Sequence, residues 1–484
     1  MTFALQIVHR RMRARAGGRR VAALRPACFG FVLAVALLAP TSGCRKPPPS
    51  EVVKPAGIER GSASRGAGAA GNEGGAVDAG LTDGPRDGDA AGLGDGAAGT
   101  GGDTSQPSTS GDGAPAPTAP FTKAALLQAV SGCAMARYRE FEADARTLAQ
   151  ATQAHADDPA GTGAKAAREA WLTAMASWQR AEQLRFGPAA RTADPGGQNL
   201  RYEIYVFPLA NPCHVDQTIA DKSYAAASFP TSLSNARGLS AIEYLLFHTG
   251  SDNACSPSFA INANGTWAAL TGAELAQRRA EYAAAAASDV LARATALVHA
   301  WEPGGGDFTS QLTAAGKASG VFAMDQDALN AVSDALFYVE HEVKDLKLGW
   351  PLGLVPDCLN SPDPCPGDVE SRYARVSTDH LRQNLAGFRD VFEGCGPGHS
   401  GLGFDDWLRE VSAGDLATRM LDALAGAQRA VDTLSPPLED ALVSDIEAAR
   451  AVHTAVKALT DLLKTEFVSV LDLELPASAE GDND

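Results

Sequence analysis

Hydrophobic residues after position 120 recur at the three- and four-residue spacing of helices that bury one side. In the first such stretch, Leu127, Val130 and Tyr138 follow this spacing. The period of two that is typical of strands is limited to one short segment, 201-RYEIYVF-207. The pattern predicts helices over about 122–150, 164–186, 272–301, 324–348, 370–393, 403–434 and 437–470, and one more around Glu243.

Helices of this length, joined by a few long loops, favour a fold made of helical bundles. About eight helices would form two four-helix-bundle-like halves. Ser232 or Ser234 is expected to cap the helix that carries Glu243. We therefore predict an all-α domain over residues 121–474, followed by an acidic tail over residues 475–484.

The first 43 residues have the pattern of an export signal. Seven arginines and no acidic residue precede the apolar run 27-ACFGFVLAVALLAP-40, which is too short to span a bilayer. The next residues, 41-TSGC-44, are similar to the site at which bacterial lipoproteins are cleaved and lipidated. We predict a signal peptide over residues 1–43 and lipidation of Cys44. The lipid would hold the protein on the cell envelope, at the outer membrane or the periplasmic face.

The segment after Cys44 is unsuited to forming a core. Residues 45–120 contain 18 of the 49 glycines and no Phe, Trp or Tyr. We predict that residues 44–120 carry the lipid and form a disordered linker to the helical domain. The formal net charge of the whole chain is −17, which makes nucleic acid an unfavourable partner and is compatible with binding cations.

Six cysteines remain after Cys28 of the signal and the lipidated Cys44 are set aside. An even number in an exported chain indicates disulfides, for which 15 pairings are possible. Cys358 and Cys365 bracket a short proline-containing loop, and Cys213 and Cys255 lie in loops on either side of the Glu243 helix. We predict these two pairs, which leaves Cys133 to pair with Cys395.

Glu243 stands in the middle of a helix that is otherwise almost wholly apolar. Both faces of this helix are expected to be buried, and a buried carboxylate needs a partner or a proton. Three interpretations follow: an ion pair with an arginine such as Arg185 or Arg201, a protonated acid, or a metal ligand. Residue statistics alone favour the ion pair.

Glu182 has the same character, because it continues the helical stripe of Trp171 and Trp178. It should therefore face a bundle cavity or pair with an arginine. Two inward acids on different helices are how metal sites in helical bundles are built, usually with a histidine three residues from one acid. Three residues before Glu243 stands Ser240.

Several segments resemble one known family. The stretch 237-RGLSAIEYLLF-247 resembles the signature helix of the imelysin-like family, whose motif is G-x-H-x-x-E. The segments 171-WLTAMASWQRAEQLRFGP-188, 204-IYVFPLANPCHVDQ-217 and 344-KDLKLGWPLGL-354 agree with the family in the same order. The resemblance covers about residues 121–472.

This resemblance implies an all-α fold of two four-helix-bundle-like halves in an exported protein that is often anchored by lipid. The founding members of the family were described as insulin-cleaving metallopeptidases. Other members are similar to iron-regulated uptake or binding proteins. The resemblance therefore implies either a binding protein or a metallopeptidase.

The family motif is matched only in part. Gly238 and Glu243 stand at motif positions, and Ser240 replaces the histidine. A serine hydroxyl is a weak ligand for zinc or iron, which the resemblance implies as the metal. A site could still form if the loop 213-CHVD-216 folds over the bundle. The candidate ligands would then be Glu243, Glu182, Asp216 and His214, with Ser240 and Gly238 shaping the pocket.

A second candidate metal site is the stretch 341-HEVKD-345, which is similar to the H-E-x-x-H motif of zinc peptidases. His341 and Asp345 would share one helix face, with Glu342 beside them. The alternative interpretation is an ordinary charged helix face. No G-x-S-x-G motif is present, so a serine hydrolase has no support.

We therefore predict a lipid-anchored envelope protein that binds a ligand in metal or iron acquisition or sensing. The first alternative is a zinc-dependent metallopeptidase. The second is a protein that binds an envelope partner or a small ligand without metal.

Overall fold

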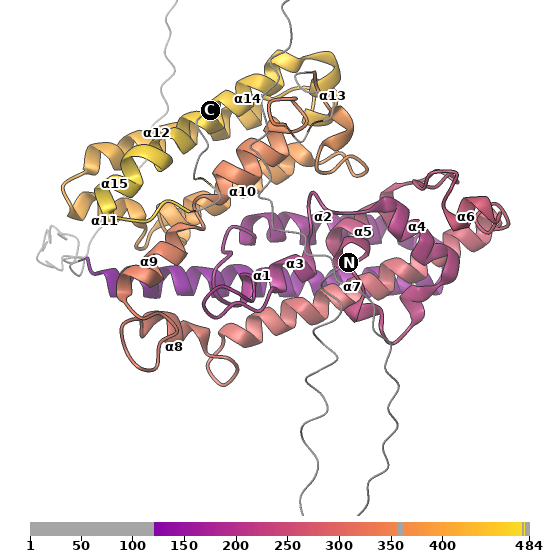
Figure 1. Cartoon of the computed structure of the whole chain (residues 1–484), viewed down its shortest axis with the longest axis horizontal. Helices are drawn as coiled ribbons and strands as arrows, with labels where there is room; N and C mark the ends of the chain where they lie inside the picture. Colours follow the sequence, from indigo (N-terminus) through magenta and orange to yellow (C-terminus); the bar gives the residue numbers. More distant parts are fainter. Residues whose placement is uncertain (1–120, 357, 359–362, 477–478, 480–484) are drawn as a thin grey trace, which may run out of the picture. The chain divides into compact units, whose positions relative to one another are not determined.

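The computed structural model describes residues 121–356, 358, 363–476 and 479, and none of these residues forms a strand. The prediction of an all-α domain is therefore confirmed. The helices form two groups that follow each other along the chain (Figure 1). The predicted signal peptide, the predicted lipidation site Cys44, the predicted linker and most of the acidic tail lie outside the described residues.

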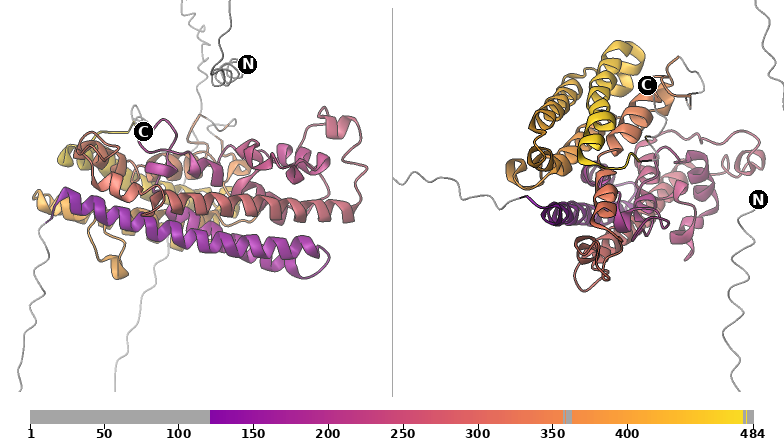
Figure 2. Two further views of the ribbon diagram at one scale, coloured as in Figure 1. Left: turned by 90° about the horizontal axis from the view of Figure 1, so that it is seen from below. Right: turned by 60° about the vertical axis from the view of Figure 1, so that its left-hand side comes forward.

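The first half is built on α1, α2, α5 and α7, with the two longest helices, α1 and α7, packed along each other (Figure 2). Small residues such as Ala134 and Ala283 are fully buried, which lets the backbones approach closely. Thr271 and Glu274 form a capping box that fixes the start of α7. The helices of this half are α1 (Lys123–Asp157), α2 (Gly163–Ala181), α3 (Leu200–Ile204), α4 (Pro212–Asp221), α5 (Gly238–Phe247), α6 (Ala260–Ala263), α7 (Gly272–Trp301) and α8 (Phe308–Thr313), with 3-10 turns η2 (Gly187–Ala189), η3 (Ser223–Ala225), η4 (Phe229–Thr231) and η5 (Ser234–Ala236).

The second half is built on α10, α12, α14 and the π-helix η6, and α10 also packs against α2 of the first half. An eleven-residue π-helix is uncommon, and π-helical turns are found mostly at functional sites. The elements of this half are α9 (Asp325–Ser333), η6 (Val339–Gly349), η7 (Pro366–Asp368), α10 (Ser377–Phe392), η8 (Pro397–His399), α11 (Phe404–Glu410), α12 (Gly414–Thr433), α13 (Leu438–Ser444), α14 (Ile446–Leu462), the short π-helix η9 (Leu463–Phe467) and α15 (Val468–Leu471).

Several predicted helices are shorter or divided, and the backbone explains where. The prediction over 324–348 separates into α9 and η6. A left-handed residue, Ser412, separates α11 from α12, and Asp445 ends α13 and caps α14. The helix predicted to start at 370 starts at Ser377, after a loop with Arg375 in the left-handed region.

The one segment with strand-like alternation, 201–207, does not form a strand. Residues Leu200–Ile204 form α3, and the chain becomes extended only at Tyr205. Arg201 is buried like its apolar neighbours, because it pairs with Glu182. The alternation of polar and apolar residues therefore does not mark one exposed face and one buried face. A period-two reading cannot detect a buried charged residue.

The predicted N-cap of the Glu243 helix is also wrong. Ser234 lies in the 3-10 turn η5, and α5 begins at Gly238 after Arg237, which makes no side-chain cap. Gly238 has φ +76°, and a Cβ there would meet the carbonyl oxygen of Ile204. This motif glycine therefore lets α5 start against α3, and its role is in the backbone and not in ligand binding.

Replacing Gly238 by alanine is expected to lower the free energy of unfolding by about 2 kcal/mol, because the left-handed conformation and the contact with Ile204 both oppose a Cβ. Urea unfolding of the purified protein measures this. The matched control is Gly132→Ala in α1, where nothing lies within 4 Å and stability should not fall. An unchanged Gly238→Ala variant would contradict the assignment.

All three predicted disulfides are confirmed: Cys133–Cys395, Cys213–Cys255 and Cys358–Cys365. The first joins α1 to the segment after α10, and so ties the two halves covalently. Among the described residues, no helix is both long enough and apolar enough to cross a membrane.

Candidate functional site

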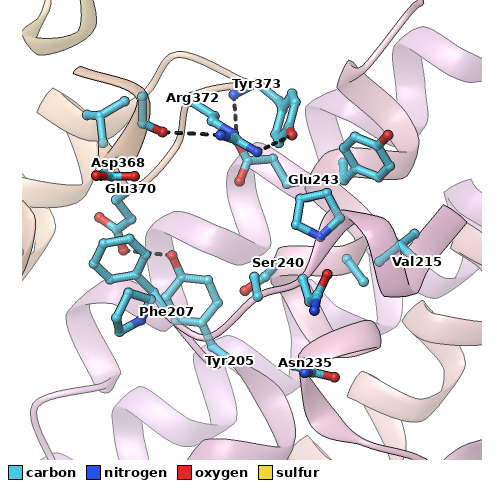
Figure 3. A pocket seen from close by; sticks show the side chains of 18 of the residues that line it. Tyr205, Phe207, Val215, Asn235, Ser240, Glu243, Asp368, Glu370, Arg372 and Tyr373 are labelled. Carbon is cyan, nitrogen blue, oxygen red and sulfur yellow. Dashed lines mark hydrogen bonds between the residues drawn. The ribbon is translucent and has the colours of Figure 1, made fainter. Parts of the chain in front are cut away.

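A small cavity of about 150 Å³ lies beside α5, where the two halves meet (Figure 3). One wall consists of α5 and the preceding chain, with Tyr205, Ser240 and Glu243. The opposite wall is the loop after η7, with Glu370 and Arg372. The cavity is therefore lined by residues that lie more than 100 positions apart in sequence.

Glu243 is buried and is held by the opposite wall. Its Oε1 accepts three hydrogen bonds, from the hydroxyl of Ser371 at 3.0 Å and from the backbone N–H groups of Tyr373 at 3.1 Å and Ala374 at 3.0 Å. The predicted ion pair with Arg185 or Arg201 is not formed, because both arginines pair with other acids. A carboxylate on α5 thus anchors the loop that leads into α10.

The second oxygen of Glu243, Oε2, receives no hydrogen bond from the part of the chain that the structure describes. Burial raises the pKa of this carboxyl, and the donors on Oε1 oppose that rise. A pocket-lining carboxylate with one free oxygen is suited to accept a hydrogen bond from a ligand, or to pair with a ligand cation.

Three further polar atoms in the wall lack a hydrogen bond from the described residues, and one of them is Oε2 of Glu370. The hydroxyl of Ser240, one helical turn before Glu243, and the indole N–H of Trp350 are both buried without a hydrogen bond. Buried polar groups are usually paired, so each exception calls for an explanation. A bound polar molecule would provide such an explanation, because the serine hydroxyl can rotate to form a hydrogen bond with it.

Glu370, in contrast, has several partners at Oε1, although its Oε2 is buried without a hydrogen bond from the described residues. It accepts hydrogen bonds from Tyr205 at 2.7 Å and Gln179 at 2.9 Å, and the ammonium of Lys347 lies 2.9 Å away. His380 Nδ1 lies 3.1 Å from its other oxygen, close enough for attraction but not aligned as a hydrogen bond. Burial opposes ionisation, yet Lys347 and His380 hold the pKa of Glu370 well below its usual range. Glu370 is therefore a fixed anion of the pocket wall.

Glu182 does not face the cavity. It pairs with Arg201 at 2.9 Å and accepts a hydrogen bond from Tyr338 at 2.8 Å, deep between α2, α3 and the second half. One of the two outcomes predicted for this acid, an arginine partner, is the one observed. Its oxygens are therefore already occupied by protein donors.

His214 and Asp216 also serve the structure. Asp216 accepts hydrogen bonds from Tyr244 and, at 2.7 Å, from the backbone of Ala254, and burial raises its pKa to about 6. The loop predicted over 213–216 is wrong, because these residues lie in α4, and the bond from Ala254 ties the segment after α5 to this helix beside the Cys213–Cys255 disulfide. His214 Nδ1 lies 3.0 Å from the amide oxygen of Asn235.

The candidate metal ligands are thus not brought together. Among the described residues, three His, Cys, Asp or Glu side chains come close enough to share a metal at one place, formed by Cys133, Asp390 and Cys395. There the two sulfurs are joined in a disulfide, and Asp390 is paired with Arg180. The pocket itself offers one free carboxylate oxygen and a serine hydroxyl, a donor set that does not fit a bare iron or zinc ion.

The stretch 341-HEVKD-345 does not form a peptidase centre either. Both oxygens of Glu342 accept hydrogen bonds from Arg185, at 2.6 and 2.8 Å. Burial would raise the pKa of Glu342, but Arg185 and its neighbours lower it to about 2. Asp345 lies 2.9 Å from Lys344. The π-helix changes the spacing expected for His341 and Asp345, and a carboxylate neutralised by arginine is a poor general base.

Sequence reasoning missed the loop that forms the second wall. Its residues Glu370, Ser371 and Arg372 stand inside the helix predicted over 370–393, which begins only at Ser377. The available signal was the polar run 367-GDVESRYA-374, which directly follows a disulfide loop and has too few apolar residues for a buried helix.

Three comparisons place these features among known proteins. The family profile described as imelysin matches residues 134–465. Iron-regulated protein A of Synechococcus elongatus is 24% identical over 338 residues, which are 69% of this chain and 82% of that protein. The profile match lies within the helical domain.

Two solved structures share the fold. A protein from Parabacteroides distasonis, described as an iron-regulated protein A precursor, has a TM-score of 0.55 and 16% identity, over 73% of this chain and 95% of that one. An imelysin-like protein from Psychrobacter arcticum has a TM-score of 0.54 and 17% identity, over 73% and 96%. At these identities the likeness concerns the fold alone.

Proposed function

The chain belongs to the imelysin family, and we propose that it is a lipid-anchored ligand-binding protein of the cell envelope with a role in iron acquisition or sensing. Its ligand site would be the cavity beside Glu243. The ligand would be a small polar molecule that donates a hydrogen bond to Glu243, and not a bare metal ion.

The free Oε2 of Glu243 carries this proposal. The other oxygen is saturated, and the carboxyl lies in a cavity wall next to the unpaired groups of Ser240 and Trp350. Burial of a half-satisfied carboxylate is costly, so a ligand donor or cation there would be stabilising. The link to iron rests on the names of the relatives, and the envelope location rests on the N-terminal sequence pattern.

A metallopeptidase is not favoured by any contact in the described residues. The best candidate base, Glu342, is neutralised by Arg185, and the pocket lacks a set of imidazole and carboxylate ligands. Hydrolysis by a bound metal would need both an open metal position and a free base.

Elemental analysis of the whole chain, purified without chelators, should find iron and zinc far below one ion per molecule. Glu243→Gln should not change that content. The reason is the donor set, in which Glu243 provides one free oxygen and Ser240 an uncharged hydroxyl. One tightly held metal ion per chain that disappears in Glu243→Gln would contradict the proposal.

The same variant tests ligand binding. Glutamine keeps an oxygen acceptor for Ser371 and the loop backbone but places an amide N–H₂ where the free oxygen stood. In a thermal-shift screen of small polar molecules, hits of the wild type that use Glu243 should lose their effect in Glu243→Gln. Ser371→Ala is the matched control, because it removes one anchor of the loop and leaves the free oxygen in place. Hits that persist in Glu243→Gln would place binding elsewhere.

A further inference from the structure

A second, larger cavity of about 540 Å³ lies on a different part of the domain. It is lined by residues 185–186 after α2, the loop over 187–195, α3, the end of α9, the start of η6 and Pro476. None of its described lining residues also lines the Glu243 pocket. The two cavities are therefore separate candidates for binding.

The loop over residues 187–195, which forms part of the cavity wall, is held in one conformation together with the residues that follow it. Gly187 and Gly196 have φ +58° and +73°, and at both positions a Cβ would collide with the ring of Phe308. The backbone N–H of Asn199 also donates to the carbonyl of Ala190 at 2.7 Å, which closes the loop on itself. The cavity is thus preformed, which reduces the entropic cost of binding.

Each guanidinium in the wall already has a carboxylate partner. Arg185 is paired with Glu342 at 2.6 Å and Arg191 with Asp194 at 3.3 Å. Arg201 is paired with Glu182 at 2.9 Å. An anionic ligand would have to compete with these carboxylates, so the arginines do not form an anion site.

Asp334, at the end of α9, is a carboxylate of the cavity wall that has no cationic partner in the described part of the chain. It makes no ion pair and its side chain accepts no hydrogen bond from the described residues, although it is partly buried. Two more acids, Glu474 and Asp194, lie near enough to oppose its ionisation. Of the charged groups that face it, Arg185 alone favours ionisation, and that arginine is bound to Glu342. Burial comes first among the causes that raise the pKa of Asp334 to about 6.

We propose that this cavity binds a small organic cation, a primary alkylammonium, with Asp334 as its counter-ion. The ammonium would supply the charge and the hydrogen-bond donors that Asp334 lacks. The alkyl part would pack against the apolar surface of Ala331, Pro195 and Pro476. This site is independent of the function proposed for the Glu243 pocket.

The proposal predicts a pH dependence with a defined sign. The ammonium binds the ionised carboxylate, so affinity should be constant above the pKa of Asp334 and fall as the pH drops below about 6. His341 also lines the cavity, and the carboxylate of Glu342, 3.7 Å from its Nδ1, raises the pKa of His341. As it gains charge at low pH, it would weaken cation binding in the same direction.

Isothermal titration of the whole chain with n-butylammonium, at pH 8 and pH 5, tests this, with 1-pentanol as the neutral probe and butyrate as the anionic one. We expect butylammonium to bind alone of the three, at least about tenfold more weakly at pH 5 and in Asp334→Asn. Asp325→Asn, at the exposed start of the same helix, is the matched control and should bind like the wild type.

Glu243→Gln should also bind butylammonium unchanged, which separates this site from the other pocket. Failure of the wild type to bind butylammonium at millimolar concentration would overturn the proposal. Tighter binding of butyrate than of butylammonium would show that the cavity prefers an anion and would also overturn the proposal. Equal affinity in Asp334→Asn would show that the cation binds elsewhere.

Discussion

Replacing Lys347 by methionine should lower the free energy of unfolding by about 3–5 kcal/mol, because it leaves the buried carboxylate of Glu370 without its ammonium partner. Lys347 is 2% exposed and also donates to Gln179 and to Asn384, at 2.9 Å from the latter. Methionine fills a similar volume, so the loss would report charge and hydrogen bonding more than a cavity. Urea unfolding at pH 7 measures it.

The pH dependence identifies the cause of this loss. The low pKa of Glu370 in the folded protein adds stability that is present above its unfolded pKa near 4.5 and is lost as the pH falls below that value. Without Lys347 the pKa of Glu370 rises, and protonation at acidic pH relieves the unpaired charge. The gap in stability between the wild type and Lys347→Met should therefore narrow from pH 7 to pH 4.

Two further variants complete the test. The double variant Lys347→Met, Glu370→Gln should be more stable than Lys347→Met, because no buried charge is left alone. Lys457→Met breaks the partly exposed pair with Asp461 and should behave almost like the wild type. A pH-independent loss in Lys347→Met would instead indicate a packing defect.

The helices could be predicted from the sequence because their spacing pattern is local. The disulfides could be predicted because the cysteine count and the expected cellular compartment both indicate them. Spacings of three and four residues identify α1 and α7, and an even cysteine count in a chain predicted to be exported indicates pairing. The helix breaks could not be predicted, because single residues in unusual backbone conformations set them, such as Ser412 at φ 65°. A serine in a polar stretch gives no sign of adopting that conformation.

The site was predicted in part, for a physical reason. An acid in an otherwise apolar helix is expected to be buried, and Glu243 is buried. Its partner could not be deduced, since the three donors come from a loop about 130 residues away. The sequence left an ion pair and a shared metal open for the inward acids, and Glu182 pairs with Arg201 and Tyr338. Spacing shows which side chains point inward, and only the fold shows which of them meet.

Removing the disulfide between Cys133 and Cys395 should have the second large effect. The two residues are separated by 262 positions, so the bond restricts the unfolded chain far more than Cys358–Cys365, which spans 7. Loop-closure entropy predicts that Cys133→Ala, Cys395→Ala costs about 3 kcal/mol more than Cys358→Ala, Cys365→Ala. Urea unfolding of the two double variants under the same oxidising conditions measures this difference.

The native contacts around the long-range disulfide sharpen this comparison. Asp390 stays paired with Arg137 and Arg180 when the sulfurs are removed, so α1, α2 and α10 keep an ionic link at the same place. The folded state should therefore change little, and the loss should come from the unfolded chain. Such a loss slows folding more than it speeds unfolding, since the halves must find each other without the covalent link. Equal losses in the two double variants would mean that residual structure already holds α1 near α10 in the unfolded state.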